Sequence, residues 1–126
     1  MNTNTKTFIK LGAIMMALSV ALGAFGAHGL KKIIEHDMLT IYQTGIQYQF
    51  YHSLGLILIG LISTLQIEQN KIKLAGWTMF AGIILFSGSL YILSITGIKI
   101  IGVITPIGGV AFILSWIFLY RSFKTI

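Results

Sequence analysis

The distribution of charge is the feature that most limits the folds open to this chain. Asp, Glu, Lys and Arg are absent from residues 11–27, 38–67, 74–98 and 100–120. As helices, these charge-free segments would be about 26 to 45 Å long, and the hydrocarbon core of a bilayer is about 30 Å thick. Each segment is therefore long enough to cross a membrane once.

The composition excludes an ordinary soluble domain. Hydrophobic residues make up 56% of the 126 residues and charged residues only 10%, whereas soluble domains are about a quarter charged. Disordered chains have low hydrophobicity, which is the opposite of this composition. Because the chain has no Cys, disulfide frameworks, thiolate nucleophiles and cysteine-ligated zinc sites are excluded as well.

We therefore predict an all-α polytopic membrane protein. Its single domain, residues 1–126, would be a bundle of four transmembrane helices over about residues 8–27, 46–67, 74–98 and 100–120. Lys6 and Lys10 before the first apolar run, with Ala24 and Gly26 near its end, also fit a secretory signal peptide. We expect an uncleaved span here.

The connection between the first two spans has an amphipathic pattern. Its apolar residues recur at helical spacing, at Leu30, Ile33, Ile34, Met38, Ile41 and Gly45. This predicts a short amphipathic interfacial helix between spans 1 and 2. Two roles are open for this helix: a lid over the ends of the spans, or a docking surface for a partner.

The positive charges predict an orientation. One face carries Lys6, Lys10, Lys71, Lys73, Arg121 and Lys124, and the other carries Lys31, Lys32 and Lys99. Because the more positive side faces the cytoplasm, we predict a multi-pass plasma-membrane protein with cytoplasmic N- and C-termini. The net charge of +6 then indicates contact with the lipid bilayer. No nucleic-acid partner is expected, since the sequence shows no basic face or aromatic platform in water.

Small residues predict the helix-packing faces. Ala13, Ala17 and Ala21 recur at four-residue spacing in the first span, with Ser19, Gly23 and Ala27 on a second such line. Small side chains let helices approach closely in lipid. Such a line serves contacts within the chain, in a homo-oligomer or with another membrane protein, and the sequence does not separate these.

Polar residues of three spans are predicted to lie at a common depth. His52 lies six positions beyond residue 46, Tyr91 seven before residue 98 and Thr105 five beyond residue 100, which corresponds to depths of about 8 to 11 Å. The complete predicted layer is His28, Tyr48, Gln49, His52, Ser89, Tyr91 and Thr105.

This polar layer has more than one interpretation. Polar groups in hydrocarbon are costly and turn inward, so hydrogen bonds that fix the helix register are the leading interpretation. A ligand, proton or ion site is the alternative, because histidine titrates near neutral pH. His28 and His52 match no specific ligand motif, and we expect no metal and no cofactor.

Catalysis and aromatic placement complete the predictions. Glu35, Asp37 and Glu68 all lie in connections, which leaves no acid–base pair inside a span, so we predict that the protein is not an enzyme.

Pro106 is predicted to start the last helix rather than break it. Trp77, Trp116 and Tyr120 are predicted to be anchors at the inner interface.

Four sequence blocks carry a family resemblance. They are GAFGAHGL at residues 23–30, YQFYH at 48–52, FSGSLY at 86–91 and TPIGG at 105–109. In this order they resemble domain-of-unknown-function family 423 of small bacterial membrane proteins, related to eukaryotic transmembrane protein 256. The resemblance implies a four-span membrane protein and no established reaction.

Two functional hypotheses follow. The first is a non-enzymatic structural or accessory protein that acts through bilayer or protein contacts, for which we expect a closed bundle with a self-satisfied polar layer. The second is a ligand-, proton- or ion-binding or conducting module, for which we expect a pocket or a water-filled recess beside that layer.

Overall fold

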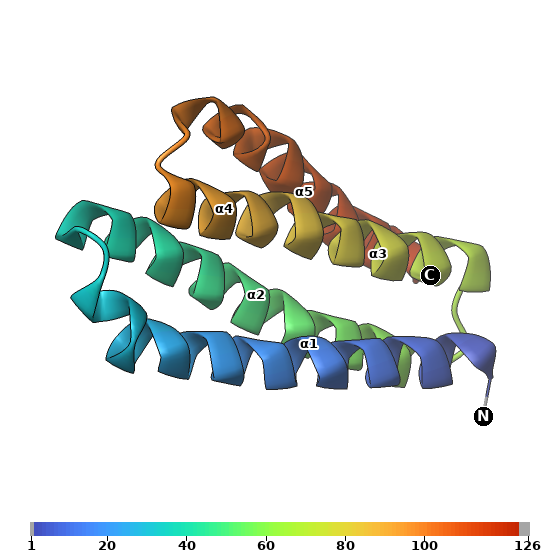
Figure 1. Ribbon diagram of the computed structural model, residues 1–126. Coiled ribbons are helices and arrows are strands. Elements are labelled where there is room, and N and C mark those ends of the chain that lie inside the picture. The colour runs from blue at the N-terminus through green and yellow to red at the C-terminus, as the bar shows by residue number, and fades with distance from the viewer. Residues whose placement is uncertain (1, 124–126) are drawn as a thin grey trace.

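The structure, a computed structural model, describes residues 2–123 and is all-helical in that range. Lys124, which enters the orientation argument, lies outside the described residues. The elements are α1 (Thr3–His28), η1 (Leu30–Lys32), α2 (His36–Ile62), α3 (Gln69–Gly82), η2 (Ile83–Ser87), α4 (Gly88–Thr96), η3 (Lys99–Val103) and α5 (Thr105–Ser122). Because α3, η2 and α4 continue one another in a single line, they act as one rod (Figure 1).

The rods form two antiparallel helix pairs (Figure 1). α1 packs along α2, and α5 packs along α3 and η2, while α2 also touches α4 and η2. The connections after α1 and after α4 lie at one end of the bundle. The loop between α2 and α3 lies at the other end, together with the N-terminus and the end of α5.

Three helical stretches among the described residues are long and apolar enough to cross a membrane. They are Thr3–Lys32, Gln69–Thr96 and Lys99–Ser122. α2 is not among them, although it has 27 residues. Its central turns carry Gln47, Gln49 and His52, and these strongly polar side chains lower its mean hydropathy.

The connection after α1 differs from the predicted interfacial helix. Only Leu30–Lys32 form a separate 3₁₀ turn, and α2 begins at His36 and continues through residue 46 without a break. Glu35 is extended and precedes the helix, and Asp37 lies in its first turn, where a negative charge stabilises the helix N-terminus. The Thr40 and Thr44 hydroxyls donate to backbone carbonyls one turn earlier, so both polar side chains have hydrogen-bond partners within the helix.

The packing face of α1 also differs from the predicted line of alanines. Ala13, Ala17 and Ala21 are exposed, whereas Ser19 of the second predicted line is buried. The buried residues include Thr5, Gly12, Ser19 and Gly26, which recur every seven positions. A Cβ on Gly12 would lie 2.8 Å from the Ser53 carbonyl oxygen of α2, so the missing side chain is what allows the two backbones to approach.

In the second helix pair, α5 approaches the backbone of the π-helical turn η2 closely. A Cβ on Gly108 of α5 would lie 2.8 Å from the Leu85 carbonyl carbon and closer still to the backbone of Phe86. Single π turns are wider than α-helix and often occur at functional sites. From the same turn, the Ser87 hydroxyl donates to the Gly45 carbonyl of α2 at 2.7 Å. η2 is therefore fixed against both neighbouring helices.

Pro106 lies in the first turn of α5, as predicted for a helix that begins with proline. The main apolar core gathers residues from all the long helices, among them Phe8 of α1, Leu56 and Ile59 of α2, Met79 of α3 and Phe112 of α5. Phe112 connects this core to the polar residues described next.

Hydrogen bonds close the end of the bundle that carries the termini. The Asn2 side chain caps α1 by accepting from the Thr5 amide, and it donates to the Ser63 carbonyl at 2.9 Å. The Thr5 and Ser63 hydroxyls are 2.7 Å apart. The start of α1 is thereby tied to the end of α2.

Candidate functional site

The residues of the predicted polar layer form three separate contacts. Gln49 pairs with Tyr91, Ser89 with Thr105, and His52 with Tyr48 and Trp116. His28 lies exposed in the last turn of α1, apart from these contacts. The predicted layer is thus divided among three local sets of contacts and does not form one cluster.

Gln49 links three helices through its side chain. It is 3% exposed. Its Nε2 donates to the Met15 carbonyl of α1 at 2.9 Å, and its Oε1 accepts from the Tyr91 hydroxyl of α4 at 2.5 Å. Because a carbonyl only accepts, the amide orientation is set by Met15. The contact fixes the rotation of α1, α2 and α4 relative to one another.

Ser89 and Thr105 link α4 to the start of α5. Their hydroxyl oxygens are 2.6 Å apart, and the Ser89 hydroxyl is also 2.9 Å from the Phe86 carbonyl. Ser89 is buried. This pair closes the second helix hairpin just below the η3 connection.

His52 uses both ring nitrogens. Its Nδ1 is 2.8 Å from the Tyr48 carbonyl, and the Trp116 indole Nε1 is 3.1 Å from its Nε2. An indole N–H only donates, so Nε2 must accept and Nδ1 must carry the proton that is donated to Tyr48. Both bonds are therefore satisfied only by the neutral Nδ1–H tautomer.

The imidazole also stacks on an aromatic ring. The ring centroids of His52 and Phe112 are 3.5 Å apart with an interplanar angle of 9°, and the Tyr48 ring lies 4.5 Å from that of Phe86. Phe112 follows Thr105 by seven residues, or about 10 Å of helix. His52 is consequently deeper in the bundle than the Ser89–Thr105 pair, and the contacts do not meet at one level.

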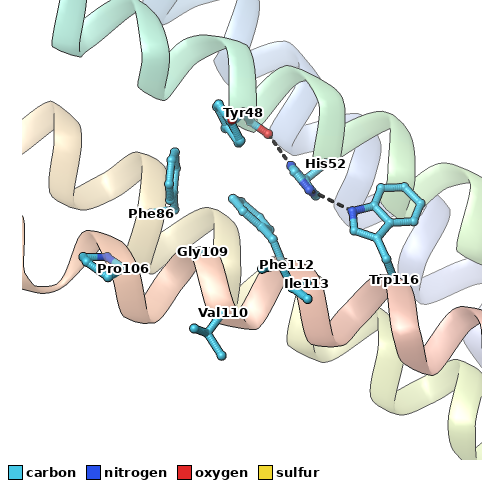
Figure 2. A pocket seen from close by; sticks show the side chains of 9 residues that line it. All are labelled: Tyr48, His52, Phe86, Pro106, Gly109, Val110, Phe112, Ile113 and Trp116. Atoms are coloured by element: carbon cyan, nitrogen blue, oxygen red, sulfur yellow. Dashed lines mark hydrogen bonds between the residues drawn. The ribbon is translucent and has the colours of Figure 1, made fainter.

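A groove of about 540 Å³ opens beside His52 (Figure 2). Aromatic rings from α2, η2 and α5 point into it, and the dashed lines in Figure 2 mark the two hydrogen bonds of His52. The lining residues are Tyr48, His52, Phe86, Pro106, Gly109, Val110, Phe112, Ile113 and Trp116. Since no carboxylate lines it, the groove offers ring faces and aliphatic surface rather than an acid–base pair.

Sequence reasoning missed Trp116 and Phe112 as partners of His52. Trp116 is 40% exposed, and its N–H is turned toward the imidazole. Trp116 and His52 are 64 positions apart in the sequence. No spacing rule within one helix signals such a pair, because it depends on how α2 and α5 face each other.

The described residues hold no cluster suited to a metal ion. Between residues 2 and 123, no three His, Asp or Glu side chains come together as ligands. Glu68 pairs with Lys71 at 2.8 Å in the loop region, and Glu35 and Asp37 lie near the start of α2.

Comparisons with known proteins agree on one family. A family model described as "Protein of unknown function (DUF423)" matches residues 22–109. The UPF0382 membrane protein YwdK of Bacillus subtilis (strain 168) is 56% identical over 89% of this chain and 91% of its own length. A UPF0382 membrane protein of Staphylococcus haemolyticus (strain JCSC1435) is 50% identical over 93% of this chain and 94% of its own. No solved structure matches.

Proposed function

This chain belongs to the DUF423 family, and on that premise we propose that it is a four-span plasma-membrane protein with a non-enzymatic structural or accessory role. It acts through contacts that its outer surface makes with lipid or with another protein. One observation carries the proposal: within residues 2–123, no buried side-chain nitrogen or oxygen lacks a hydrogen-bond partner. The interior is thus committed to holding the helices together.

The placement of polar side chains supports α2 as the fourth span. Gln49, His52 and Ser53 are buried against the other helices, whereas Leu54 and Leu58 are exposed. In a membrane, every polar group must be satisfied away from lipid. Gln49 and His52, which lower the hydropathy of α2, are therefore hidden from the bilayer, whereas Gln47 is exposed. The 27 residues of α2 extend about 40 Å.

The positive charges support cytoplasmic termini. Lys6, Lys10, Lys71, Lys73 and Arg121 belong to the end that carries the termini, and Lys31, Lys32 and Lys99 belong to the other. The first group is the larger, and positively charged residues are enriched on the cytoplasmic side.

The experiment compares interior and surface variants in a strain that lacks the chromosomal gene. The readout is competitive growth under membrane stress, with the amount of protein in the membrane measured in parallel. Tyr91→Phe removes an interior hydrogen bond, and it should lower thermal stability while the protein that remains still restores growth. Ala17→Trp adds bulk to the exposed face of α1, and it should impair growth at an unchanged melting temperature.

The opposite pattern would overturn the proposal. If Tyr91→Phe or Gln49→Leu abolished growth at normal protein amount and normal melting temperature, the polar contacts would be a functional site rather than a structural one.

A second candidate function is the binding of an apolar membrane molecule in the groove beside His52. Its volume of about 540 Å³ and its aromatic lining favour this candidate. Gly109→Leu would place a side chain in the groove, whereas Gly88→Leu adds the same group where a Cβ meets open space. If the groove is occupied, a molecule retained during mild-detergent purification should be lost from the first variant and kept by the second, as measured by native mass spectrometry.

A further inference from the structure

A second cleft lies at the end of the bundle that carries the termini. It has a volume of about 430 Å³ and lies between the first three turns of α1 and Trp77 of α3. The Trp77 ring is held in place at one wall because it packs edge-to-face with the buried ring of Phe8, with centroids 5.5 Å apart. The cleft is therefore built by two helices and is separate from the groove beside His52.

The wall formed by α1 changes from cationic to apolar along the helix. Lys6 and Lys10, with Thr3 and Thr7, line the part nearest the helix start, and Ile14 lines the deeper part. These residues share one face, because positions three and four apart are neighbours on a helix. From Thr3 to Ile14 the helix rises by about 16 Å. A ligand that fills this cleft must be polar at one end and apolar at the other.

The charge in the cleft is unbalanced. Lys6 and Lys10 are one turn apart, so their ammonium groups repel each other, and the first turn of α1 contains no acidic residue. Of the three acids in the chain, Glu35 and Asp37 belong to the start of α2 at the other end, and Glu68 pairs with Lys71. An anion from outside the chain would relieve this repulsion.

We propose that this cleft binds one anionic phospholipid. The phosphate group lies between the Lys6 and Lys10 ammonium groups and accepts from the Thr3 and Thr7 hydroxyls, while an acyl chain runs over Ile14. Trp77 lies at the level of the glycerol esters, where tryptophan is enriched at membrane interfaces. Basic pockets between helices on the cytoplasmic side suit such headgroups.

The test uses tryptophan quenching in vesicles. The full chain is reconstituted in phosphatidylcholine that contains a small fraction of phosphatidylglycerol, and either lipid carries bromine on its acyl chains as the quencher. We expect brominated phosphatidylglycerol to quench Trp77 preferentially. The preference should be about fivefold or more, since each lysine near an anionic surface contributes about that factor. Trp77→Phe should remove the preferential component and leave only the signal of Trp116.

Matched charge variants decide the outcome. Lys6→Gln with Lys10→Gln should reduce the preference to near unity. Lys31→Gln with Lys32→Gln removes the same charge at the opposite end and should leave it intact. Equal loss in both double variants would overturn the proposal, because quenching would then report net charge alone.

Two further results would also overturn it. One is an unchanged preference in the Lys6→Gln and Lys10→Gln double variant. The other is displacement of the preferential quenching by millimolar inorganic phosphate, which would show a small-anion site rather than a lipid site. Since both lysines are exposed, the double variant should fold, and its circular dichroism and melting temperature should match those of the parent protein.

Discussion

At the scale of single residues, the buried polar side chains each form specific hydrogen bonds, and the chemistry of the partner fixes the direction of each bond. The Trp116 indole can only donate, so it selects the His52 tautomer that accepts at Nε2. Gln49 meets a carbonyl on one side and a hydroxyl on the other. These pairings leave little freedom for alternative helix rotations, because a buried polar group without a partner costs about 1 to 3 kcal/mol.

Replacement of Trp116 tests the contact with His52. Trp116→Phe keeps an aromatic ring but removes the N–H, so His52 Nε2 loses its donor, and we expect the protein to be less stable by about 1 kcal/mol. Trp77→Phe is the matched control, because Trp77 is 44% exposed and its ring packs against the rings of Phe8 and Phe80. The measurement is thermal unfolding in mild detergent. Equal melting temperatures for the two variants would contradict the assignment.

Replacement of Tyr91 tests the contact with Gln49. Tyr91→Phe leaves the buried Gln49 Oε1 without a donor, and we expect a loss of about 1 to 3 kcal/mol. Tyr120→Phe, at a residue that is 81% exposed, should change little. A double-mutant cycle with Gln49→Leu should show that the second substitution costs much less once the first is made. Strictly additive losses would mean that the two side chains do not interact.

At the scale of helices, close approach is decided by where side chains are missing. Gly12 lets α1 reach the backbone of α2, and Gly108 lets α5 reach the π turn of the third rod. Lipid supplies no hydrophobic driving force between helices, so such approach is a main source of packing energy. The exposed alanines of α1 are also small but face away from the bundle.

Two glycines give opposite expectations for the same substitution. Gly108→Ala would force its Cβ into the backbone of Phe86, and we expect a loss of about 1 to 3 kcal/mol from overpacking. Gly88→Ala adds its Cβ in open space within a helix, so a gain of about 0.4 to 1 kcal/mol is expected. Chemical or thermal unfolding of both variants measures whether each substitution raises or lowers the free energy of unfolding. Stabilisation by Gly108→Ala would show that α5 and η2 are further apart than described.

At the scale of the whole molecule, the two helix pairs place both chain ends and the α2–α3 loop on one side (Figure 1). The connections η1 and η3 lie at the other side. If all four rods cross the bilayer, the residues just before α2 and just after it must face opposite compartments. Topology is thus a direct consequence of whether α2 spans.

Single cysteines test this topology, because the chain has none of its own. Ile33→Cys, at a residue that is 75% exposed, lies before α2, and Asn70→Cys lies in the first turn of α3. In intact cells, a membrane-impermeant maleimide should label the first and not the second, and both should react after lysis. Identical labelling of both positions in intact cells would exclude a crossing by α2.

The sequence by itself determined the helical class and the membrane character of this protein. Charge-free segments of bilayer length and scarce polar side chains are local properties, so they can be read without knowing which helix lies beside which. The same reasoning identified Gln49, Tyr91, Ser89 and Thr105 as polar residues that need partners, because unpaired polar groups are costly in hydrocarbon.

Only the tertiary structure decided which partners they find. The Met15 carbonyl, Trp116 and the Phe112 ring lie on other helices, and the contacts depend on how each rod is rotated and tilted. It also decided that Gly12, not Ala13, faces α2. Residues 36–46, which were predicted as part of a separate helix, form the beginning of α2. In lipid, small residues on either side of a helix are nearly equivalent until a second helix is in place, so sequence alone cannot rank them.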